Sequence, residues 1–528
     1  MSGKHAGRRS RAERSSLAGL ASRALGWSFA SNMVARLGTL PLGVVLARLL
    51  GPHAFGTFAV ALVALLAILS FNDLSVSLAI VRWNGDPAEI APTVATLSVA
   101  SSLLIYGACF AAAPAFAAAM GAPAATGVIR VLALNVLVDG LVATPAALMQ
   151  RQFRQDRKMI ADQVNNWLGV AVSVGLAWQG FGAMSLAVGR MTGAVASAVL
   201  FLVFSPEPFR FGFDLAQARS LLRFGLPLAG SSIIVFAVIN VDQLVVGHLL
   251  GVTALGFYAL AANLAYWPVN TFSLPVRSVA PAVFSRLQHD PAAMRSGFLS
   301  AAALLGAATL PICLLISGSA VPLLWLVYGK QWVPAAPALA WLVAFSALRI
   351  MYELIYDFFV VLARSRVVFT VQLLWLLGLV PALIAGARID GIAGAGLAEV
   401  AVAACVVLPC YLTELGKVGI RRRDLAARLW LPVVVAAAVG CAAAIAARAI
   451  PAHLAALAVG GAAMAAGFGL LGWRMRPVIA AMRRDLVTEP AEAPARPAKP
   501  AARTRGAHRR TLPANGTYLS APETAGSR

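Results

Sequence analysis

Long apolar stretches separated by short polar loops dominate this chain. A helix that crosses a bilayer needs about 20 mainly apolar residues at a rise of 1.5 Å per residue. With that rule the pattern predicts about fourteen membrane-spanning helices, so we expect an all-α integral membrane protein. The predicted spans lie near residues 26–50, 54–81, 90–117, 126–149, 159–180, 182–204, 224–250, 254–284, 298–323, 334–362, 366–387, 390–415, 426–449 and 453–473.

Arginine and lysine are distributed unequally between the two sets of loops. With the N-terminus in the cytoplasm, the loops on the cytoplasmic side contain the basic clusters within 151–158, 210–223 and 417–428. The opposite side holds little more than Arg130, Lys330, Arg388 and Arg448. Because basic loops stay on the cytoplasmic side, this asymmetry predicts that both termini are cytoplasmic and that the number of spans is even.

A stretch near residue 250 repeats one that lies 200 residues earlier. The sequence Leu-Leu-Gly at 249–251 recurs at 49–51. Matched glycines over a long self-alignment favour a duplicated helical unit. Since both copies would begin on the cytoplasmic side, we expect two six-helix halves related by a parallel repeat, followed by two extra C-terminal helices. The other matched positions are Ala254, Gly256 and Ala259 with Ala54, Gly56 and Ala59.

The repeat divides the chain into five parts. A basic cytoplasmic N-terminus, 1–25, precedes the first six-helix bundle, 26–223, and the second bundle, 224–415. Two additional transmembrane helices follow in 416–473. The last part, 474–528, is rich in alanine, proline and arginine, and we expect a disordered basic cytoplasmic tail, because it buries too little apolar area to offset the cost of ordering.

Composition favours a membrane protein and disfavours a nucleic-acid partner. Hydrophobic residues make up 60% of the 528 residues and charged residues 12%, against about 25% charged in an ordinary soluble domain. The net charge of +22 is concentrated at the two ends and in short loops. That distribution follows the positive-inside rule, so we expect no nucleic acid to bind.

The sequence carries no motif of catalysis, cofactor binding or metal binding. It has no cluster of His, Cys and carboxylates with metal-ligand spacing, no Walker motif and no nucleophile elbow. The five cysteines all lie in apolar segments, where they act as small apolar residues. No loop exceeds about 20 residues, which leaves no external acceptor domain. We therefore expect no enzymatic activity, no cofactor and no metal.

Ionisable residues inside the apolar spans are the candidate functional residues, because a charge at the bilayer centre costs at least about 2.5–3.5 kcal/mol. The sequence analysis selects Arg36, Arg190 and Arg277 as candidates for a hydrated cavity. For Arg36 the alternative is an ion pair with a structural carboxylate. Asp242 lies well inside the span 224–250 and is a further candidate.

One predicted span carries three charges on the same helical face. Arg349, Glu353 and Asp357 follow each other at intervals of four residues within 334–362, and residues so spaced share a face. One interpretation is a polar face that lines a water-filled cavity. The other is an internal salt bridge that neutralises Arg349. Glu399, by contrast, lies among small residues that favour close helix packing.

Three motifs carry a resemblance to a known family. Residues 241–261 read V-D-Q-L-V-V-G-x-L-L-G-x-x-x-L-G-x-Y-x-L-A, and 268–287 read P-x-x-x-x-x-x-P-x-R-x-x-x-P-x-x-F-S-R-L. Residues 36–58 read R-L-G-T-L-P-L-G-V-V-L-A-R-L-L-G-P-x-x-F-G-x-F. Over roughly 20–475 the chain resembles bacterial polysaccharide exporters, the Wzx-type flippases of the multidrug/oligosaccharidyl-lipid/polysaccharide superfamily.

The resemblance implies a function. Members move an undecaprenyl-diphosphate-linked oligosaccharide across the plasma membrane by alternating access between two helix bundles, for exopolysaccharide, capsule or O-antigen of lipopolysaccharide. It implies a bacterial inner membrane location among membrane lipids, with a polysaccharide polymerase and glycosyltransferases as partners. The implied pyrophosphate-binding arginines, suited by their forked donors, are Arg36, Arg190, Arg277 and Arg349. The implied residues for coupling to H⁺ or Na⁺ are Asp242, Glu353 and Asp357.

Several alternatives stay open at this stage. A lipid II flippase and a MATE-like drug/cation antiporter belong to the same superfamily, and the antiporter would favour a cavity dominated by carboxylates over one rich in arginine. A membrane glycosyltransferase or ligase is disfavoured by the short loops. A scaffold without transport activity is the remaining alternative.

Overall fold

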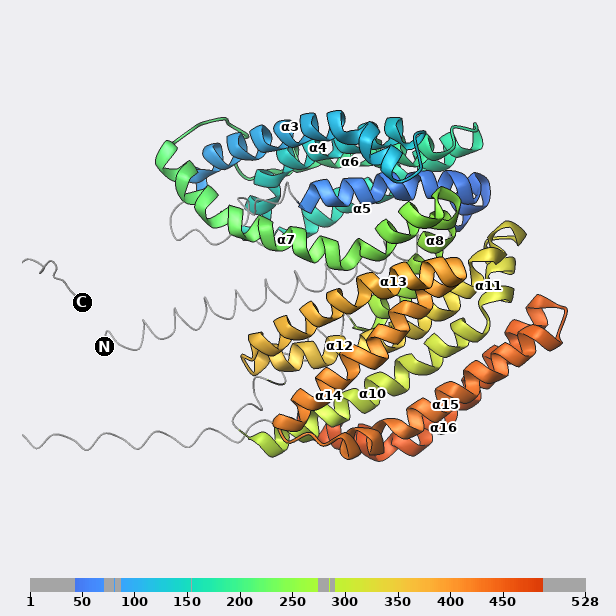
Figure 1. Ribbon diagram of the computed structural model, residues 1–528. Coiled ribbons are helices and arrows are strands. Elements are labelled where there is room, and N and C mark those ends of the chain that lie inside the picture. Colours follow the sequence, from blue (N-terminus) through green and yellow to red (C-terminus); the bar gives the residue numbers. More distant parts are fainter. Residues whose placement is uncertain are drawn as a thin grey trace, which may run out of the picture. The chain divides into compact units, whose positions relative to one another are not determined.

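The structure is a computed structural model, and it describes residues 43–70, 80, 87–152, 154–273, 284 and 290–487. Helices account for nearly all of these residues, which confirms the all-α prediction (Figure 1). Ten helices in the described ranges are long and apolar enough to cross a membrane. The protein is therefore a multi-pass membrane protein, and the number fourteen stays a prediction.

The first half of the described chain packs as a group of long helices. Helix α3 packs on α4, α5 packs on α6, and α4 contacts α6. Helix α5 begins with polar residues such as Asp162 and Gln163, and it is not among the ten apolar helices, although the pattern predicts a span at 159–180. The helices are Gly43–Ser70, α3 Pro87–Ala119, α4 Ala125–Arg151, α5 Gln155–Trp178 and α6 Ala183–Phe204.

The second half packs around α12. This helix lies against α8, α10 and α13, and α12 and α13 run side by side in Figure 1. The helices are α7 Leu215–Leu250, α8 Val252–Pro268, η1 Val269–Ser273, α10 Pro291–Gly318, α11 Ala320–Val327, η2 Lys330–Ala335, α12 Ala336–Val361, α13 Ser365–Val402, η3 Ala403–Val407 and α14 Leu408–Lys417. Two further helices, α15 Arg422–Ala449 and α16 His453–Val487, follow, and α15 packs on α10.

Glycines with positive φ interrupt the regular helical backbone at matched positions of the two copies. Gly51 has φ +72° and Gly251 has φ +82°, a conformation that glycine adopts without steric cost. These are the matched glycines of the repeated Leu-Leu-Gly sequence. Within α13 the backbone leaves the helical region at Asp390 and Gly391. That break lies at the start of the predicted span 390–415, just after the predicted span 366–387.

The repeated stretches contact each other. A Cβ atom on Gly56 would overlap the carbonyl oxygen of Val252, and a Cβ on Gly256 would overlap the carbonyl oxygen of Pro52. Equivalent residues of the two copies thus exchange equivalent contacts, as a local two-fold axis requires. Only glycine permits this approach of two helix backbones. The division into two six-helix halves stays a prediction.

Helix α16 extends past residue 474, the predicted start of the tail, while the division of the chain into five parts stays a prediction. We expected a disordered tail from residue 474, but the helix continues to Val487. The physical reason is the pattern R-M-R-P-V-I-A-A-M-R-R-D-L-V at 474–487, which places apolar residues at helical spacing between arginines. The part of the prediction that concerns 488–528 lies outside the described residues.

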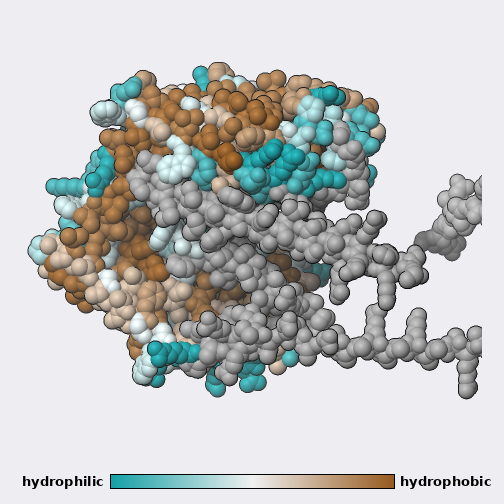
Figure 2. All heavy atoms as spheres, turned by 180° about the vertical axis from the view of Figure 1, so that it is seen from behind, coloured by the Kyte–Doolittle hydropathy of each residue, from teal (hydrophilic) through white to brown (hydrophobic). Residues whose placement is uncertain are grey.

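The surface agrees with a lipid environment. Figure 2 shows hydrophobic residues spread over wide areas of one face of the molecule. Large apolar side chains are mostly exposed to the surroundings, for example Trp178, Ile389 and Leu104. A soluble protein rarely exposes such extended apolar patches, so these side chains are placed to contact lipid.

Candidate functional site: a buried charge cluster and a contact between the halves

Charged side chains from three helices meet inside the second half. Asp242 comes from α7, Arg349 and Glu353 from α12, and Glu399 from α13. Asp242 is only 3% exposed and Glu399 only 5%. All four lie in apolar helices, where an ionised side chain is retained at a cost in free energy. Their convergence marks this cluster as the candidate site.

Arg349 is the centre of the cluster. Its Nε atom lies 3.4 Å from Glu353 Oε1, and its guanidinium carbon lies 4.9 Å from the centre of the Tyr266 ring. The same guanidinium attracts both Asp242 and Glu399. One arginine therefore holds three carboxyl groups and an aromatic ring around it.

Asp242 and Glu399 form an unfavourable pair. The two carboxylates repel each other, and both are attracted by the guanidinium of Arg349. Asp242 and the neighbouring Tyr258 hydroxyl interact with each other, but among the described residues neither Asp242 Oδ1 nor that hydroxyl makes a hydrogen bond of ordinary geometry. A buried charge without full compensation is costly. The arrangement is chemically suited to take up a proton or a monovalent cation.

The predicted face of α12 is only partly an open polar face. The Arg349–Glu353 ion pair exists, as the salt-bridge interpretation requires, and its side chains are 24% and 18% exposed. Asp357 lies one helical turn further and is buried. In the part of the chain that the structure describes, no group of three or more His, Cys, Asp or Glu side chains could hold a metal ion.

A second charged pair lies in the first half. Arg190 of α6 and Asp139 of α4 attract each other. Both side chains are exposed, although both helices are apolar enough to span a membrane. Because charges avoid lipid, exposed charges in such helices face water or polar partners. This pair is therefore a candidate lining of a hydrated path.

Two of the predicted arginines, Arg36 and Arg277, lie outside the described residues. Four residues near these charges were not predicted as site residues: Glu399, Tyr258, Tyr266 and Asp139. For Glu399 a usable signal existed, since a lone carboxylate in an apolar segment is the same signal that selected Asp242. The surrounding glycines and alanines favoured a packing interpretation instead. For the two tyrosines no sequence signal distinguishes them from interfacial residues.

Hydrogen bonds join the two halves near the helix ends that the loop charges predict to lie outside. Arg48 Nε donates to the carbonyl of Val327 at 2.8 Å. Trp332 is fully buried, and its Nε1 donates to the carbonyl of Ala47 at 3.0 Å. His248 Nδ1 lies 2.7 Å from the Ala119 carbonyl oxygen. We call these three pairs, together with the packing of Gly56 on Gly256, the outer contact.

A matching aromatic cluster surrounds Trp332 in the outer contact. Its ring meets Phe55 edge-on, with ring centres 5.5 Å apart, and Phe257 likewise at 5.9 Å. Phe55 belongs to the first half and Phe257 to the second, so one indole packs against both. Edge-to-face aromatic pairs add about 0.5–1.5 kcal/mol beyond their area burial.

Comparison with known proteins identifies the family. The sequence model of the family described as "Polysaccharide biosynthesis protein" matches residues 45–337, more than half of the chain. Over 323 residues the chain is 26% identical to the succinoglycan biosynthesis transport protein ExoT of Rhizobium meliloti (strain 1021). The match covers 60% of this chain and 64% of ExoT, so the chain spans less than two thirds of that relative. It is 26% identical over 413 residues to the lipopolysaccharide biosynthesis protein WzxC of Escherichia coli (strain K12), covering 77% of this chain and 83% of WzxC.

Solved structures show the same fold at low sequence identity. The lipid II flippase MurJ, in an inward closed conformation, superposes with a TM-score of 0.69 at 13% identity, over 86% of this chain and all of MurJ. An inward-facing multidrug resistance MATE transporter of the MOP superfamily gives 0.58 at 17% identity, over 73% and 94% of the two chains. These similarities establish the transporter fold.

Proposed function

The chain belongs to the polysaccharide biosynthesis protein family, and from this premise we propose that it is a flippase for lipid-linked oligosaccharides. The substrate would be an undecaprenyl-diphosphate-linked repeat unit of a cell-surface polysaccharide. The observation that carries the proposal is the family match over residues 45–337. The names of two relatives, a succinoglycan transport protein and a lipopolysaccharide biosynthesis protein, support the substrate class.

The proposed location is the bacterial inner membrane, with both termini in the cytoplasm. The basic clusters within 151–158, 210–223 and 417–428 support this orientation through the positive-inside rule. A polymerase and glycosyltransferases are the proposed protein partners, because a flipped repeat unit must be made on one side and consumed on the other. The chain itself is proposed to have no enzymatic role.

The proposed mechanism is alternating access between the two halves. The outer contact closes one end of the path, and breaking it would open that end. Arg190, Arg36 and Arg277 are proposed to guide the pyrophosphate, since a forked guanidinium pairs with phosphate oxygens. Arg349 was predicted for the same role, but its contact with Glu353 supports a role in organising the charge cluster.

The charge cluster is proposed to couple transport to H⁺ or Na⁺. Asp242 and Glu399 share one guanidinium, so binding a cation relieves their repulsion. Since α7, α12 and α13 each contribute a group, uptake of a cation would change the packing of three helices at once. Glu353 and Asp357 are proposed as further members of this ion path.

A second candidate function has a specific observation in its favour. Three carboxyl groups surround one arginine in the charge cluster, and a cavity dominated by carboxylates suits an antiporter of cationic drugs. The fold similarity to a MATE transporter is compatible with that function. Export remains the main proposal because the family match refers to polysaccharide biosynthesis.

The test is transport by the purified full chain in proteoliposomes. Flipping of a fluorescent undecaprenyl-diphosphate oligosaccharide is measured beside lipid II and a fluorescent cationic drug, with imposed H⁺ or Na⁺ gradients. We expect flipping of the oligosaccharide and about tenfold slower flipping by Arg190→Ala, since one charge-assisted contact contributes about 1.5–3 kcal/mol. Arg130→Ala, outside the proposed path, is the matched control. Drug transport without oligosaccharide flipping would overturn the proposal.

A further inference from the structure

A cavity lies at the end of the first half that the loop charges predict to be cytoplasmic, and its walls contain none of the residues of the charge cluster. Its volume is about 120 Å³, which is small beside the roughly 300–1,000 Å³ of drug-sized sites. The start of α3, the end of α4 and the loop between α6 and α7 form its walls. The lining residues on which we rely are Ala91, Pro92, Thr144, Leu148, Phe209 and Arg210.

The loop that carries Arg210 is fastened to α3. Thr96 Oγ1 donates to the carbonyl of Gly212 at 2.7 Å, and the Gly212 amide donates to the carbonyl of Pro92 at 3.3 Å. Asp214 then caps α7 by accepting from the amides of Ala216 and Gln217. These hydrogen bonds fix the backbone that follows Arg210. The Arg210 side chain therefore extends from an ordered segment.

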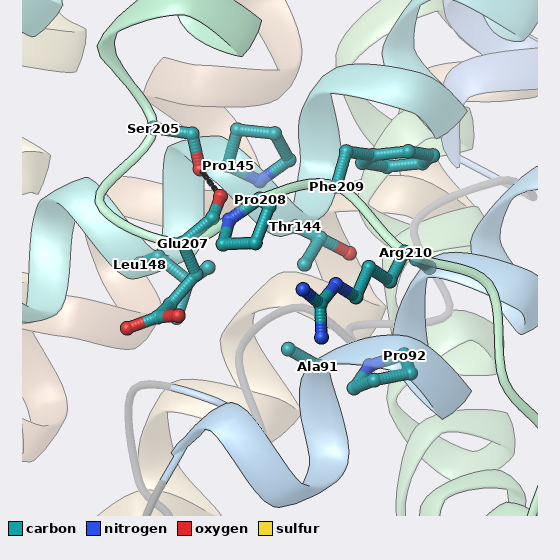
Figure 3. A pocket seen from close by; sticks show the side chains of 11 residues that line it. Ala91, Pro92, Thr144, Pro145, Leu148, Ser205, Glu207, Pro208, Phe209 and Arg210 are labelled. Carbon is teal, nitrogen blue, oxygen red and sulfur yellow. Dashed lines mark hydrogen bonds between the residues drawn. The ribbon is translucent and has the colours of Figure 1, made fainter.

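Two polar groups face the cavity without a partner among the described residues. Figure 3 shows the Arg210 guanidinium turned toward the wall of Ala91 and Pro92, while the Glu207 carboxylate points the other way. No ion pair to Arg210 is formed within the described part of the chain. Thr144 is 4% exposed, and its hydroxyl has no hydrogen-bond partner among the residues that the structure describes. A buried hydroxyl left unpaired costs about 1–3 kcal/mol, so a ligand that accepts its hydrogen bond would be stabilised.

The remaining wall is apolar. Ala91, Pro92, Leu148 and Phe209 supply hydrocarbon, so a soluble anion would contact only one side of the cavity favourably. A ligand with a phosphate and an adjoining apolar part would satisfy both sides. Along the chain, the lining residue Leu148 lies just before the basic cluster at 151–158, and Arg210 begins the one at 210–223. Basic pockets on the cytoplasmic side of transmembrane helices attract anionic headgroups.

We propose that this cavity binds the phosphate of an anionic phospholipid of the inner leaflet, with Arg210 pairing with the phosphate oxygens and Thr144 donating a hydrogen bond. The glycerol and the start of the acyl chains rest on the apolar wall. The lipid thereby ties the loop before α7 to α3 and α4. This proposal concerns a bound membrane lipid and does not depend on which substrate is transported.

The experiment is native mass spectrometry of the full chain, purified in a neutral detergent and titrated with phosphatidylglycerol or phosphatidylcholine. We expect the wild type to retain phosphatidylglycerol in preference to phosphatidylcholine, whose choline cation would lie near Arg210. The variant Arg210→Gln should bind phosphatidylglycerol about tenfold more weakly, since a charge-assisted hydrogen bond is lost. The matched control Arg219→Gln removes an exposed arginine outside the cavity and should bind as the wild type does.

A second variant and a competition measurement complete the experiment. Thr144→Val keeps the shape of the buried side chain and removes the hydroxyl, so binding should weaken by a few-fold while the melting temperature is retained. Millimolar inorganic phosphate should not displace the lipid. Equal binding by Arg210→Gln and Arg219→Gln would overturn the proposal. Arg210-dependent binding of inorganic phosphate, with no preference between the two lipids, would also overturn it and assign the cavity to a soluble phosphate.

Discussion

Single side chains decide how the charge cluster is stabilised. Arg349 contacts Glu353 and Tyr266 and attracts Asp242 and Glu399, so among the described residues it is the basic group on which the cluster depends. Removing one partner of a buried ion pair is costly because the other charge is left unpaired. Removing one of two carboxylates that repel each other should instead lower the free energy of the folded state. Substitution of the arginine should therefore change the stability of the protein, whereas substitution of a carboxylate should change the coupling of transport to an ion.

The substitution Arg349→Gln should destabilise the protein by about 3 kcal/mol, the low end for a broken buried ion pair, because the pair is partly exposed. Unfolding in detergent, followed by circular dichroism, measures this effect. The double variant Arg349→Gln with Glu353→Gln should recover part of the loss. If Arg349→Gln unfolds at the wild-type temperature, the arginine does not organise the cluster.

The substitution Glu399→Gln should keep the protein folded and abolish the dependence of transport on the coupling ion. It removes one of the two carboxylates that share Arg349 while preserving shape, so the need for a cation disappears. Transport in proteoliposomes is measured with and without H⁺ or Na⁺ gradients. Asp156→Asn, an exposed carboxylate in the first turn of α5, is the matched control. A Glu399→Gln variant that still responds fully to a gradient would refute the coupling role.

The two helices that carry the repeated sequence contact each other closely through their backbones. Gly56 and Gly256 each face a backbone carbonyl oxygen of the opposing helix, at Val252 and Pro52. Backbone atoms move less readily than side-chain ends, so an added methyl group forces the two helices apart. Overpacking of this kind costs about 1–3 kcal/mol.

The substitution Gly256→Ala should therefore lower the melting temperature, by a free-energy loss of about 1–3 kcal/mol. Gly107→Ala in α3 is the matched control, because its Cβ would meet no atom within 4 Å. That control should be neutral or stabilising by up to about 1 kcal/mol, since alanine loses less entropy than glycine in a helix. Equal melting temperatures for the two variants would contradict the close contact.

At the scale of the whole molecule, the outer contact links two halves that are distant in sequence. His53 Nδ1 lies 3.2 Å from Thr253 Oγ1, so two residues 200 positions apart touch. Arg48 and Trp332 add hydrogen bonds between the same regions. If transport proceeds by alternating access, these pairs must separate once in every cycle.

Joining the two sides should therefore stop transport. In a background without the five native cysteines, His53→Cys and Thr253→Cys are combined and treated with a short thiol crosslinker that a reductant can cleave. We expect loss of nearly all flipping after crosslinking and recovery after reduction. Each single-cysteine variant, treated alike, is the control. Wild-type flipping by the crosslinked protein would show that the outer contact is not part of the cycle.

Much of the architecture follows from the sequence alone. The apolar spans, the excess of basic residues in alternate loops and the repeated Leu-Leu-Gly sequence are local features of the chain. Solvation by lipid acts on each span separately, so hydropathy determines the all-α membrane class without knowledge of packing. The motifs at 36–58, 241–261 and 268–287 likewise indicated the exporter family, which the family match confirms.

Only the tertiary structure decided which buried charges meet. Asp242, Arg349 and Glu399 lie on three helices, separated by long stretches of sequence, and no local pattern states how those helices are rotated about their axes. Helical spacing brought Arg349 and Glu353 together because they share one helix, whereas Glu399 was interpreted as a packing residue. The outer contact depends on tertiary structure for the same reason. The packing of helices decides which side chains of different helices pair. The lipid around each apolar segment decides whether that segment forms a membrane-spanning helix.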